Sequence, residues 1–233
     1  MNKDPEVIQN MFGKIAQPYD FINGILSLQL HKFWNRQLAN SLKAKHTLLD
    51  LCSGTGEIAY RWLEQQKTPK TAIFLDFCEE MLEVAKAKRL PHLIKGHDLR
   101  FIQADASFLP LANESIDGAS VAYGIRNVQK PEKCFLEVFR VLKPCGKLSI
   151  LELTQPENSF LKFLHTLYLE KVLPFIGGLL TNEKEAYSYL AKSVQTFSEP
   201  HELKDQLLTS GFKEIHIRPL TGGIATLIEA SKK

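Results

Sequence analysis

Short apolar runs rich in β-branched or aromatic residues alternate with longer amphipathic segments along most of this 233-residue chain. Such alternation is typical of strand–helix–strand units, which build a parallel sheet covered by helices. We expect five buried strands, at residues 47–51, 71–75, 99–103, 116–121 and 147–151. The clearest helix follows Lys130, with apolar residues at helical spacing up to Leu142. The pattern therefore predicts an α/β fold with a Rossmann-like, mostly parallel sheet.

The two ends of the chain depart from this rhythm. Residues 1–45 look helical and precede the first strand, where they could form a cap over the ligand crevice at the carboxyl ends of the strands. Two final strands, at 214–218 and 224–230, flank the turn residues Thr221-Gly222-Gly223 and predict a closing antiparallel hairpin. We expect one structural unit, with a cap over 1–45 and a main domain over 46–233 that carries a helical insertion at about 158–195.

Composition and termini exclude several classes of protein. With 44% hydrophobic and 24% charged residues, the chain resembles an ordinary globular protein. Its net charge of +3 is small and dispersed, so we expect no nucleic acid partner. The four cysteines lack C-x-x-C spacing, and the N-terminus lacks the apolar core of a secretory signal. These features predict a cytoplasmic protein with free thiols and no bound metal.

Residues 160–180 are apolar and about as long as a membrane span. Charges at mid-span cost about 2.5 to 3.5 kcal/mol each, and this segment contains Lys162, Glu170 and Lys171. We therefore predict an interfacial or lid helix rather than a transmembrane one. One face of it would carry Phe160, Phe163, Leu164, Leu167 and Tyr168. Packing of that face on the core is the alternative.

The first expected strand runs directly into the loop Asp50-Leu51-Cys52-Ser53-Gly54-Thr55-Gly56. Two glycines at a strand-to-helix turn let the backbone approach a ligand closely. The spacing Gly54-x-Gly56-x-x-Ala59 satisfies the dinucleotide fingerprint, and Asp76 ends the next strand where an acid on a ribose hydroxyl is expected. A nicotinamide or flavin enzyme is therefore one reading of this loop.

Three acidic residues at strand ends favour a different ligand. Asp50 would face a pyrophosphate with like charge, whereas it suits the positive amine or sulfonium of S-adenosylmethionine. Asp105 ends the third strand, where a carboxylate can accept a hydrogen bond from an adenine amino group. Asp76 and Asp105 could each be an ordinary helix N-cap, but their placement at successive strand ends favours S-adenosylmethionine as the cofactor.

Several spaced sequence motifs give more specific information about the function of the chain. The N-terminal region carries Tyr19-Asp20-x-Ile22-Asn23-x-x-Leu26-Ser27-x-x-x-His31-x-x-Trp34. Other blocks are Arg140-Val141-Leu142-Lys143-Pro144-Cys145-Gly146 with Glu152-Leu153-Thr154, Gly124-Ile125-Arg126-Asn127-Val128 and Leu220-Thr221-Gly222-Gly223-Ile224. Together they resemble, over nearly the whole chain, the methyltransferases that add the ring methyl group in menaquinone and ubiquinone biosynthesis. The chain departs from that pattern at Ile22, Cys145 and Thr154, where methionine, glycine and serine are usual.

The resemblance implies a class I S-adenosylmethionine-dependent C-methyltransferase. Its acceptor would be a ring carbon of a prenylated quinol, demethylmenaquinol first and the benzoquinol precursor of ubiquinone as the alternative. A methyltransferase acting on another lipid is a further alternative, and a non-catalytic membrane module is disfavoured by the complete cofactor motifs. Because the acceptor's tail lies in the bilayer, we expect transient, peripheral contact with the membrane surface. The tail length and the oligomeric state, a homodimer included, stay open.

The resemblance also implies roles for particular residues. The cofactor contacts would be Thr55, Asp76, Asp105 and Ala106, with Gly54 and Gly56 shaping the loop and a weaker claim for Glu57; the charge argument adds Asp50. Arg126 would stabilise a phenolate, directly or through a water, and Asn127 would orient the ring oxygen. Because arginine stays protonated, His31, Tyr19 and Asp20 are the candidates for proton transfer. Alternatively, His31 packs with Trp34 in a capping helix, and Arg126 pairs structurally with Glu152.

Overall fold

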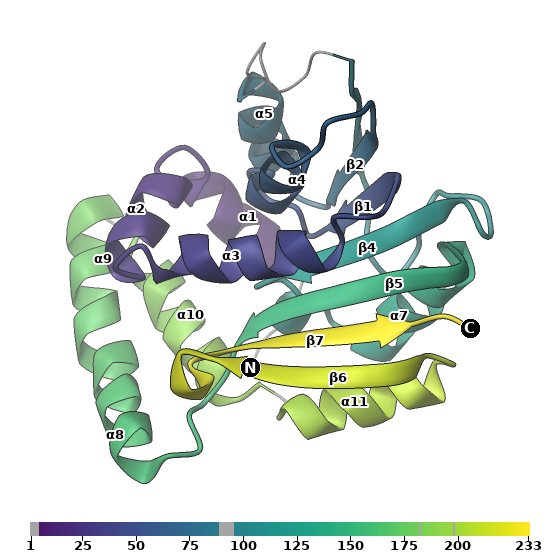
Figure 1. Ribbon diagram of the computed structural model, residues 1–233. Coiled ribbons are helices and arrows are strands. Elements are labelled where there is room, and N and C mark those ends of the chain that lie inside the picture. Colours follow the sequence, from purple (N-terminus) through teal and green to yellow (C-terminus); the bar gives the residue numbers. More distant parts are fainter. Residues whose placement is uncertain (1–4, 89–95, 182, 198) are drawn as a thin grey trace.

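A seven-stranded sheet in the order β3-β2-β1-β4-β5-β7-β6 forms the centre of the computed structural model, which describes residues 5–88, 96–181, 183–197 and 199–233 (Figure 1). The first five strands are mutually parallel, and β7 runs antiparallel to its neighbours β5 and β6. The predicted sheet with its closing antiparallel hairpin is thus confirmed. The strands are β1 Thr47–Leu51, β2 Thr71–Asp76, β3 Asp98–Gln103, β4 Ile116–Ala122, β5 Leu142–Leu153, β6 Lys213–Leu220 and β7 Ala225–Ser231.

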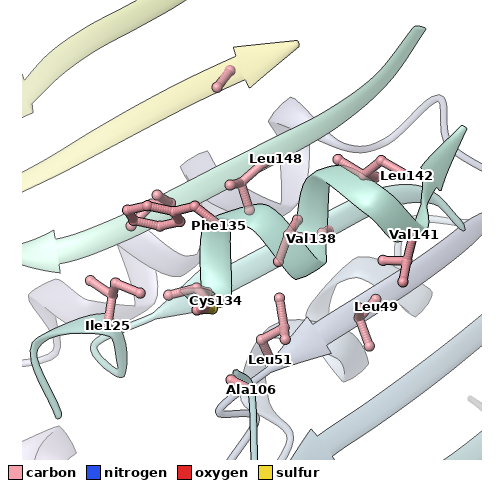
Figure 2. Packing of buried hydrophobic residues seen from close by; sticks show 14 of the residues in the cluster. Leu49, Leu51, Ala106, Ile125, Cys134, Phe135, Val138, Val141, Leu142 and Leu148 are labelled. Atoms are coloured by element: carbon pink, nitrogen blue, oxygen red, sulfur yellow. The ribbon is translucent and has the colours of Figure 1, made fainter. Parts of the chain in front are cut away.

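One face of the sheet is covered by α7 (Pro131–Val141) and α11 (Pro200–Thr209). Each helix has a proline in its first turn, where the missing N–H costs no hydrogen bond. The apolar stripe of α7 packs on the central strands, and Cys134 and Val141 lie toward Leu51 and Leu49 of β1 (Figure 2). The predicted helix after Lys130 therefore supplies much of this half of the core.

The opposite face is covered by α3 (Leu30–Ser41), α4 (Glu57–Leu63) and α5 (Glu79–Ala87). The fully buried Trp62 of α4 anchors this layer, since its indole N–H donates to the carbonyl of Leu42, 2.9 Å away. The two layers hold the first two strands and the loop after β1 in fixed positions. That rigidity is what a precise ligand site needs.

A third cluster lies beyond the carboxyl ends of the strands, where the N-terminal helices meet the insertion between β5 and α11 (Figure 1). Ile22 and Leu26 from the first group pack there with Leu169, Leu173 and Tyr187 from the second. The helices of the two segments are α1 Pro5–Ile15 and α2 Tyr19–Leu26 at the N-terminus, and α8 Ser159–Leu167, the π-helical turn η2 Tyr168–Val172, α9 Leu173–Thr181 and α10 Lys184–Gln195 in the insertion.

The insertion differs from the regular helix that its sequence predicts. A π-helical turn begins at Tyr168, six residues before Pro174, which cannot donate a backbone hydrogen bond. Tyr168 is the first residue of this turn, and its hydroxyl donates to the carbonyl of Leu26 at 2.5 Å. Of the residues predicted to share one exposed face, Phe160, Phe163, Leu164 and Leu167 are exposed, whereas Tyr168 ties the insertion to α2.

Candidate functional site

Two cavities adjoin each other at the carboxyl ends of β1 and β4. We call them the first cavity, of about 300 Å³, and the second cavity, of about 270 Å³. Their shared lining comes from the cap, the loop after β1 and the end of β4, and comprises Phe12, Tyr19, Cys52, Gly54, Ala122 and Tyr123. A molecule in one cavity would therefore come into contact with a molecule in the other at this junction.

Most of the residues predicted to bind the cofactor surround the second cavity. Asp76, Asp105 and Ala106 line it together, although 29 positions separate the two acids in sequence. Asp76 is buried, and its carboxylate accepts the backbone N–H groups of Gly54 at 2.7 Å and Cys78 at 2.9 Å. Burial raises the pKa of Asp76, while the backbone donors act against that rise. The acid thus holds the glycine loop and reaches the second cavity.

The loop after β1 has the conformation that a close ligand contact requires. Gly54 has φ +51°, and a Cβ built there would meet nothing within 4 Å, so the backbone is open to a ligand at that point. Gly56 has φ +80°, and a Cβ there would lie 2.7 Å from the Phe74 ring. A side chain at Gly54 would narrow the space where the cavities meet, and a side chain at Gly56 would displace a core aromatic.

The loop also fits the polar, amino-acid end of S-adenosylmethionine. Ser53 Oγ is buried beside the first cavity and has no hydrogen-bond partner among the residues that the structure describes. An orphaned hydroxyl of this kind suits a carboxylate or amine ligand. Together with Gly54, Asp76 and Asp105, it would hold the cofactor across both cavities. The bound cofactor would supply an electrophilic methyl group at the junction.

Asp50 is fully buried at the end of β1, and both its carboxylate oxygens have donors within the protein. The backbone N–H of Ala59 donates to it at 3.2 Å and the Ser120 hydroxyl at 2.7 Å. Desolvation by burial raises the pKa of Asp50 to about 7. A positive amine or sulfonium nearby would favour its charged form. Asp50 lines the first cavity. Its pairing with the positive amine or sulfonium of the cofactor stays a prediction.

Apolar side chains from the cap and from the insertion form a large part of the wall of the first cavity. This part of the wall comprises Met11, Phe12, Ile15, Leu26, Leu28, Leu30, Leu169, Leu173, Ala186 and Leu190. Polar residues near the strand ends and on α3, among them His31, Asn35, Glu57 and Tyr123, line another part of it, and the cap and the insertion add Asp20, Asn23, Ser27 and His165. A ligand with a polar ring and an apolar tail would match this distribution.

Arg126 and Asn127 follow β4 in a short 3₁₀ turn but reach different cavities. Arg126 lines the first cavity and is buried, and its guanidinium pairs with the buried Glu152 and donates to Ser193 Oγ at 3.3 Å. Asn127 lines the second cavity, and its side-chain oxygen accepts the hydroxyl of Tyr189, which lines the first cavity, at 3.1 Å. The structure therefore does not bring these two predicted residues together around one acceptor ring.

Tyr19 and Asp20, at the start of α2, both lie at the first cavity, as does Thr55. Asp20 accepts the Thr55 hydroxyl at 2.5 Å and pairs with Lys88, which also donates to the carbonyl of Thr55 at 3.0 Å. Burial raises the pKa of Tyr19. Asp20 thus ties the N-terminal cap to the glycine loop, a role that its sequence position alone did not indicate.

Two further residues that line the first cavity were not predicted from the sequence. Tyr123 follows β4 with φ +56°, an uncommon conformation for a tyrosine that is a pointer to function. Its hydroxyl donates to Asn35 Oδ1 at 2.9 Å. Asn35 lies four residues after His31, one helical turn along the same face, and that spacing was the available signal.

Comparison with known proteins agrees with this geometry. The model of the ubiE/COQ5 methyltransferase family matches residues 1–232. The chain is 45% identical over 231 residues to the demethylmenaquinone methyltransferase of Protochlamydia amoebophila, covering 98% of this chain and 96% of the relative. It is 38% identical over 235 residues to the ubiquinone/menaquinone biosynthesis C-methyltransferase UbiE of Bdellovibrio bacteriovorus, covering 99% and 97%.

Among solved structures, an S-adenosylmethionine-dependent methyltransferase from Thermotoga maritima superimposes with a TM-score of 0.64 at 20% identity. The match covers 96% of this chain and all of that one, and it identifies the fold. The glycine loop, the acids at the strand ends and the full-length sequence matches lead to one assignment. The chain belongs to the ubiE/COQ5 methyltransferase family and is an S-adenosylmethionine-dependent methyltransferase.

Proposed function

We propose that this enzyme transfers the methyl group of S-adenosylmethionine to a ring carbon of a prenylated quinol, converting demethylmenaquinol to menaquinol. The observation that carries the proposal is the pair of adjoining cavities, one lined by the acids of β2 and β3 and the other mostly apolar. The printed names of its relatives, demethylmenaquinone methyltransferase and UbiE, support the same acceptor class.

The chemistry asks the protein for three things. A quinol ring carbon becomes strongly nucleophilic when the adjacent hydroxyl loses its proton, so the site must accept that proton and stabilise the phenolate. It must also hold the ring carbon in line with the methyl group. In this proposal the Arg126 guanidinium offers positive charge at the first cavity, and the helices of the cap and of the insertion exclude water and hold the ring.

A direct assay tests the function and its alternatives. Purified enzyme is supplied with S-adenosylmethionine and either demethylmenaquinol or the benzoquinol precursor of ubiquinone. Each quinol is kept reduced in detergent micelles, and the masses of the products are measured by mass spectrometry. We expect a gain of one methyl group on demethylmenaquinol. Methylation of the benzoquinol alone would replace the proposed acceptor, and methylation of neither would overturn the quinol assignment.

The proposal extends to the membrane surface, because the acceptor's tail is embedded in the bilayer. Helices α2, α8 and α9 lie at one end of the molecule, with α2 and α9 in contact (Figure 1). These helices, the α2–α3 turn and the start of α3 carry exposed apolar side chains. We call this set the apolar surface: Phe21, Ile25, Leu28, Leu30, Phe33, Phe160, Phe163, Leu164, Leu167, Phe175, Leu179 and Leu180. Leu28, 80% exposed, also lines the first cavity, so the cavity reaches this surface.

The insertion fits a helix that lies on a bilayer. The segment Ser159–Leu180 is long and apolar enough, by length and composition, to cross a membrane, and 28% of its most apolar window is buried. Exposed Lys32, Lys162 and Lys171 border the apolar surface and would meet anionic headgroups. Contacts of the segment with α10 hold it against the protein. These observations support docking in the interface plane, with the enzyme otherwise in the cytoplasm.

Polar substitution of the apolar surface is expected to weaken membrane binding. Replacing Phe163 and Leu167 by serine removes two exposed side chains, and each could bury enough apolar area to contribute about 1.5 to 3 kcal/mol to binding. We expect binding to anionic liposomes in a co-sedimentation assay to fall by at least about tenfold. The matched control is Leu136→Ser on α7, 54% exposed and remote from the apolar surface. Equal binding by both variants would contradict the assignment.

A further inference from the structure

We propose that Glu57 and His31 form the proton-accepting pair for the acceptor hydroxyl, with Asn35 and Tyr123 as the residues that position it. The inference rests on the proposed function and deepens it, because it assigns a proton acceptor in the first cavity. Glu57 begins α4 directly after the glycine loop, and His31 and Asn35 lie one turn apart on α3. All four side chains line the first cavity.

The contacts of these residues form a continuous series that ends at the junction of the two cavities. Glu57 Oε2 accepts a hydrogen bond from Asn35 Nδ2 at 2.9 Å, and Asn35 Oδ1 accepts the Tyr123 hydroxyl at 2.9 Å. Tyr123 lines both cavities, and the methyl group has to be transferred where they meet. The series therefore fixes the Glu57 carboxylate with respect to the reaction centre.

The histidine is oriented from its other side. His31 Nδ1 lies 2.6 Å from the Ser27 hydroxyl, which also donates to the carbonyl of Asn23 at 2.6 Å. Because the Ser27 hydroxyl donates its hydrogen to that carbonyl, its oxygen accepts a hydrogen bond from His31 Nδ1–H. In a neutral histidine Nε2 then carries the lone pair. Nε2 lies 3.7 Å from Glu57 Oε2, longer than a hydrogen bond. Nε2 and the carboxylate, which has more lone pairs than its hydrogen bond from Asn35 uses, can each accept the proton of an acceptor hydroxyl.

The other ionisable groups that line the first cavity are already engaged or carry a proton. Asp20 is held by Thr55 and Lys88, and Asp50 by Ala59 and Ser120. The Arg126 guanidinium pairs with Glu152 and has no lone pair to offer. Tyr19 keeps its proton, because burial raises its pKa. His165, which also lines the cavity, is the remaining competitor and enters the experiment as such.

The surroundings shift the pKa values of the two side chains toward each other. Burial chiefly raises the pKa of Glu57, helped by Asp20 and opposed by Lys88, Arg61 and Lys32. Burial also chiefly lowers the pKa of His31, helped by Lys32 and Arg61 and opposed by Asp20. A base whose pKa lies near the working pH is the most effective proton acceptor. The raised pKa makes the Glu57 carboxylate a stronger base than an ordinary one, and the lowered pKa favours the neutral His31 imidazole, which can accept a proton.

The proposed step balances in protons and electrons. The hydroxyl proton passes to the pair, and the O–H bonding electrons stay on oxygen and are delocalised onto the ring carbon. That carbon forms a bond to the methyl group while the methyl–sulfur bond breaks, leaving its electrons on sulfur. The ring carbon then loses its own hydrogen as a proton, the ring oxygen regains one, and a single proton is released overall.

Glu57→Gln is the sharpest test, because glutamine keeps the shape and can still accept the Asn35 N–H. We expect kcat to fall by about 100-fold or more, the contribution typical of a positioned base. The Kd for S-adenosylhomocysteine and the Tm should stay close to the wild-type values. The rate of the variant should increase with pH beyond the range where the wild-type rate levels off, because solvent hydroxide has to replace the carboxylate. A kcat within about threefold of wild type would overturn the proposal.

His31→Asn and His165→Asn separate the two histidines of the cavity. We expect His31→Asn to lower kcat and to shift its pH dependence, while His165→Asn leaves that dependence in place. The reverse result would transfer the role to His165 and overturn the proposal. Wild-type enzyme that methylates no quinol would instead refute the proposed function, so the two failures are distinguishable.

Discussion

Replacing Arg126 by alanine is expected to lower the free energy of unfolding by about 3 to 5 kcal/mol, because it leaves a buried charge unpaired. The side chains of Arg126 and Glu152 are 4% and 1% exposed and pair directly. The same carboxylate accepts the Leu153 backbone N–H at 2.9 Å, so it cannot turn to solvent. Urea unfolding followed by circular dichroism, with and without S-adenosylhomocysteine, measures the loss. A change below about 1 kcal/mol would show that the pair is dispensable for stability.

A double variant separates this structural role from catalysis. Replacing both partners, as Arg126→Met with Glu152→Leu, removes both charges at similar volume and is expected to regain most of the stability. If Arg126 also stabilises the phenolate, the folded double variant should bind S-adenosylhomocysteine normally yet methylate at least about 100-fold more slowly. Near wild-type methylation by the double variant would leave Arg126 with a structural role alone.

Much of the fold could be predicted because its determinants are local. Each parallel strand reads as a short apolar run, and the stripe from Cys134 to Val141 on α7 repeats at helical spacing, so both can be recognised without tertiary information. The insertion was harder. A π-helical turn interrupts its regular helix from Tyr168 onward, and the hydrogen bond that holds Tyr168 is made to Leu26, which lies on a helix distant in sequence.

Some contacts of the candidate site could likewise be predicted from the sequence, and others could not. Asp76 and Asp105 could be placed at the same site from the sequence, because the carboxyl ends of neighbouring parallel strands lie at one edge of the sheet. The partnership of Glu57 with Asn35 and Tyr123 could not, because it joins three elements that only the tertiary packing brings together. Arg126 illustrates the ambiguity: its position after β4 suggested catalysis, and the structure adds the ion pair with Glu152 that was its alternative reading.

Replacing Asp76 by alanine is expected to weaken the binding of S-adenosylhomocysteine by about 100-fold, as measured by isothermal titration. The carboxylate would lose hydrogen bonds to the ribose hydroxyls, and each hydrogen bond to a charged group contributes about 1.5 to 3 kcal/mol. The backbone N–H groups of Gly54 and Cys78 would also lose their acceptor, which loosens the glycine loop. Asp98→Ala, at the exposed start of β3, is the control and should bind normally. Unchanged affinity in the Asp76 variant would mean that the ribose contact is wrong.

A cofactor analogue without ribose hydroxyls separates the two effects of Asp76. If Asp76 holds those hydroxyls, the wild-type enzyme should bind the 2′,3′-dideoxy analogue of S-adenosylhomocysteine far more weakly than the parent compound. Asp76→Ala should then discriminate little between the two ligands, because the interaction that distinguishes them is already gone. If Asp76 acts only by holding the loop through Gly54, the variant should discriminate between the ligands as strongly as the wild type does. The coupling between variant and analogue therefore measures the ribose contact itself.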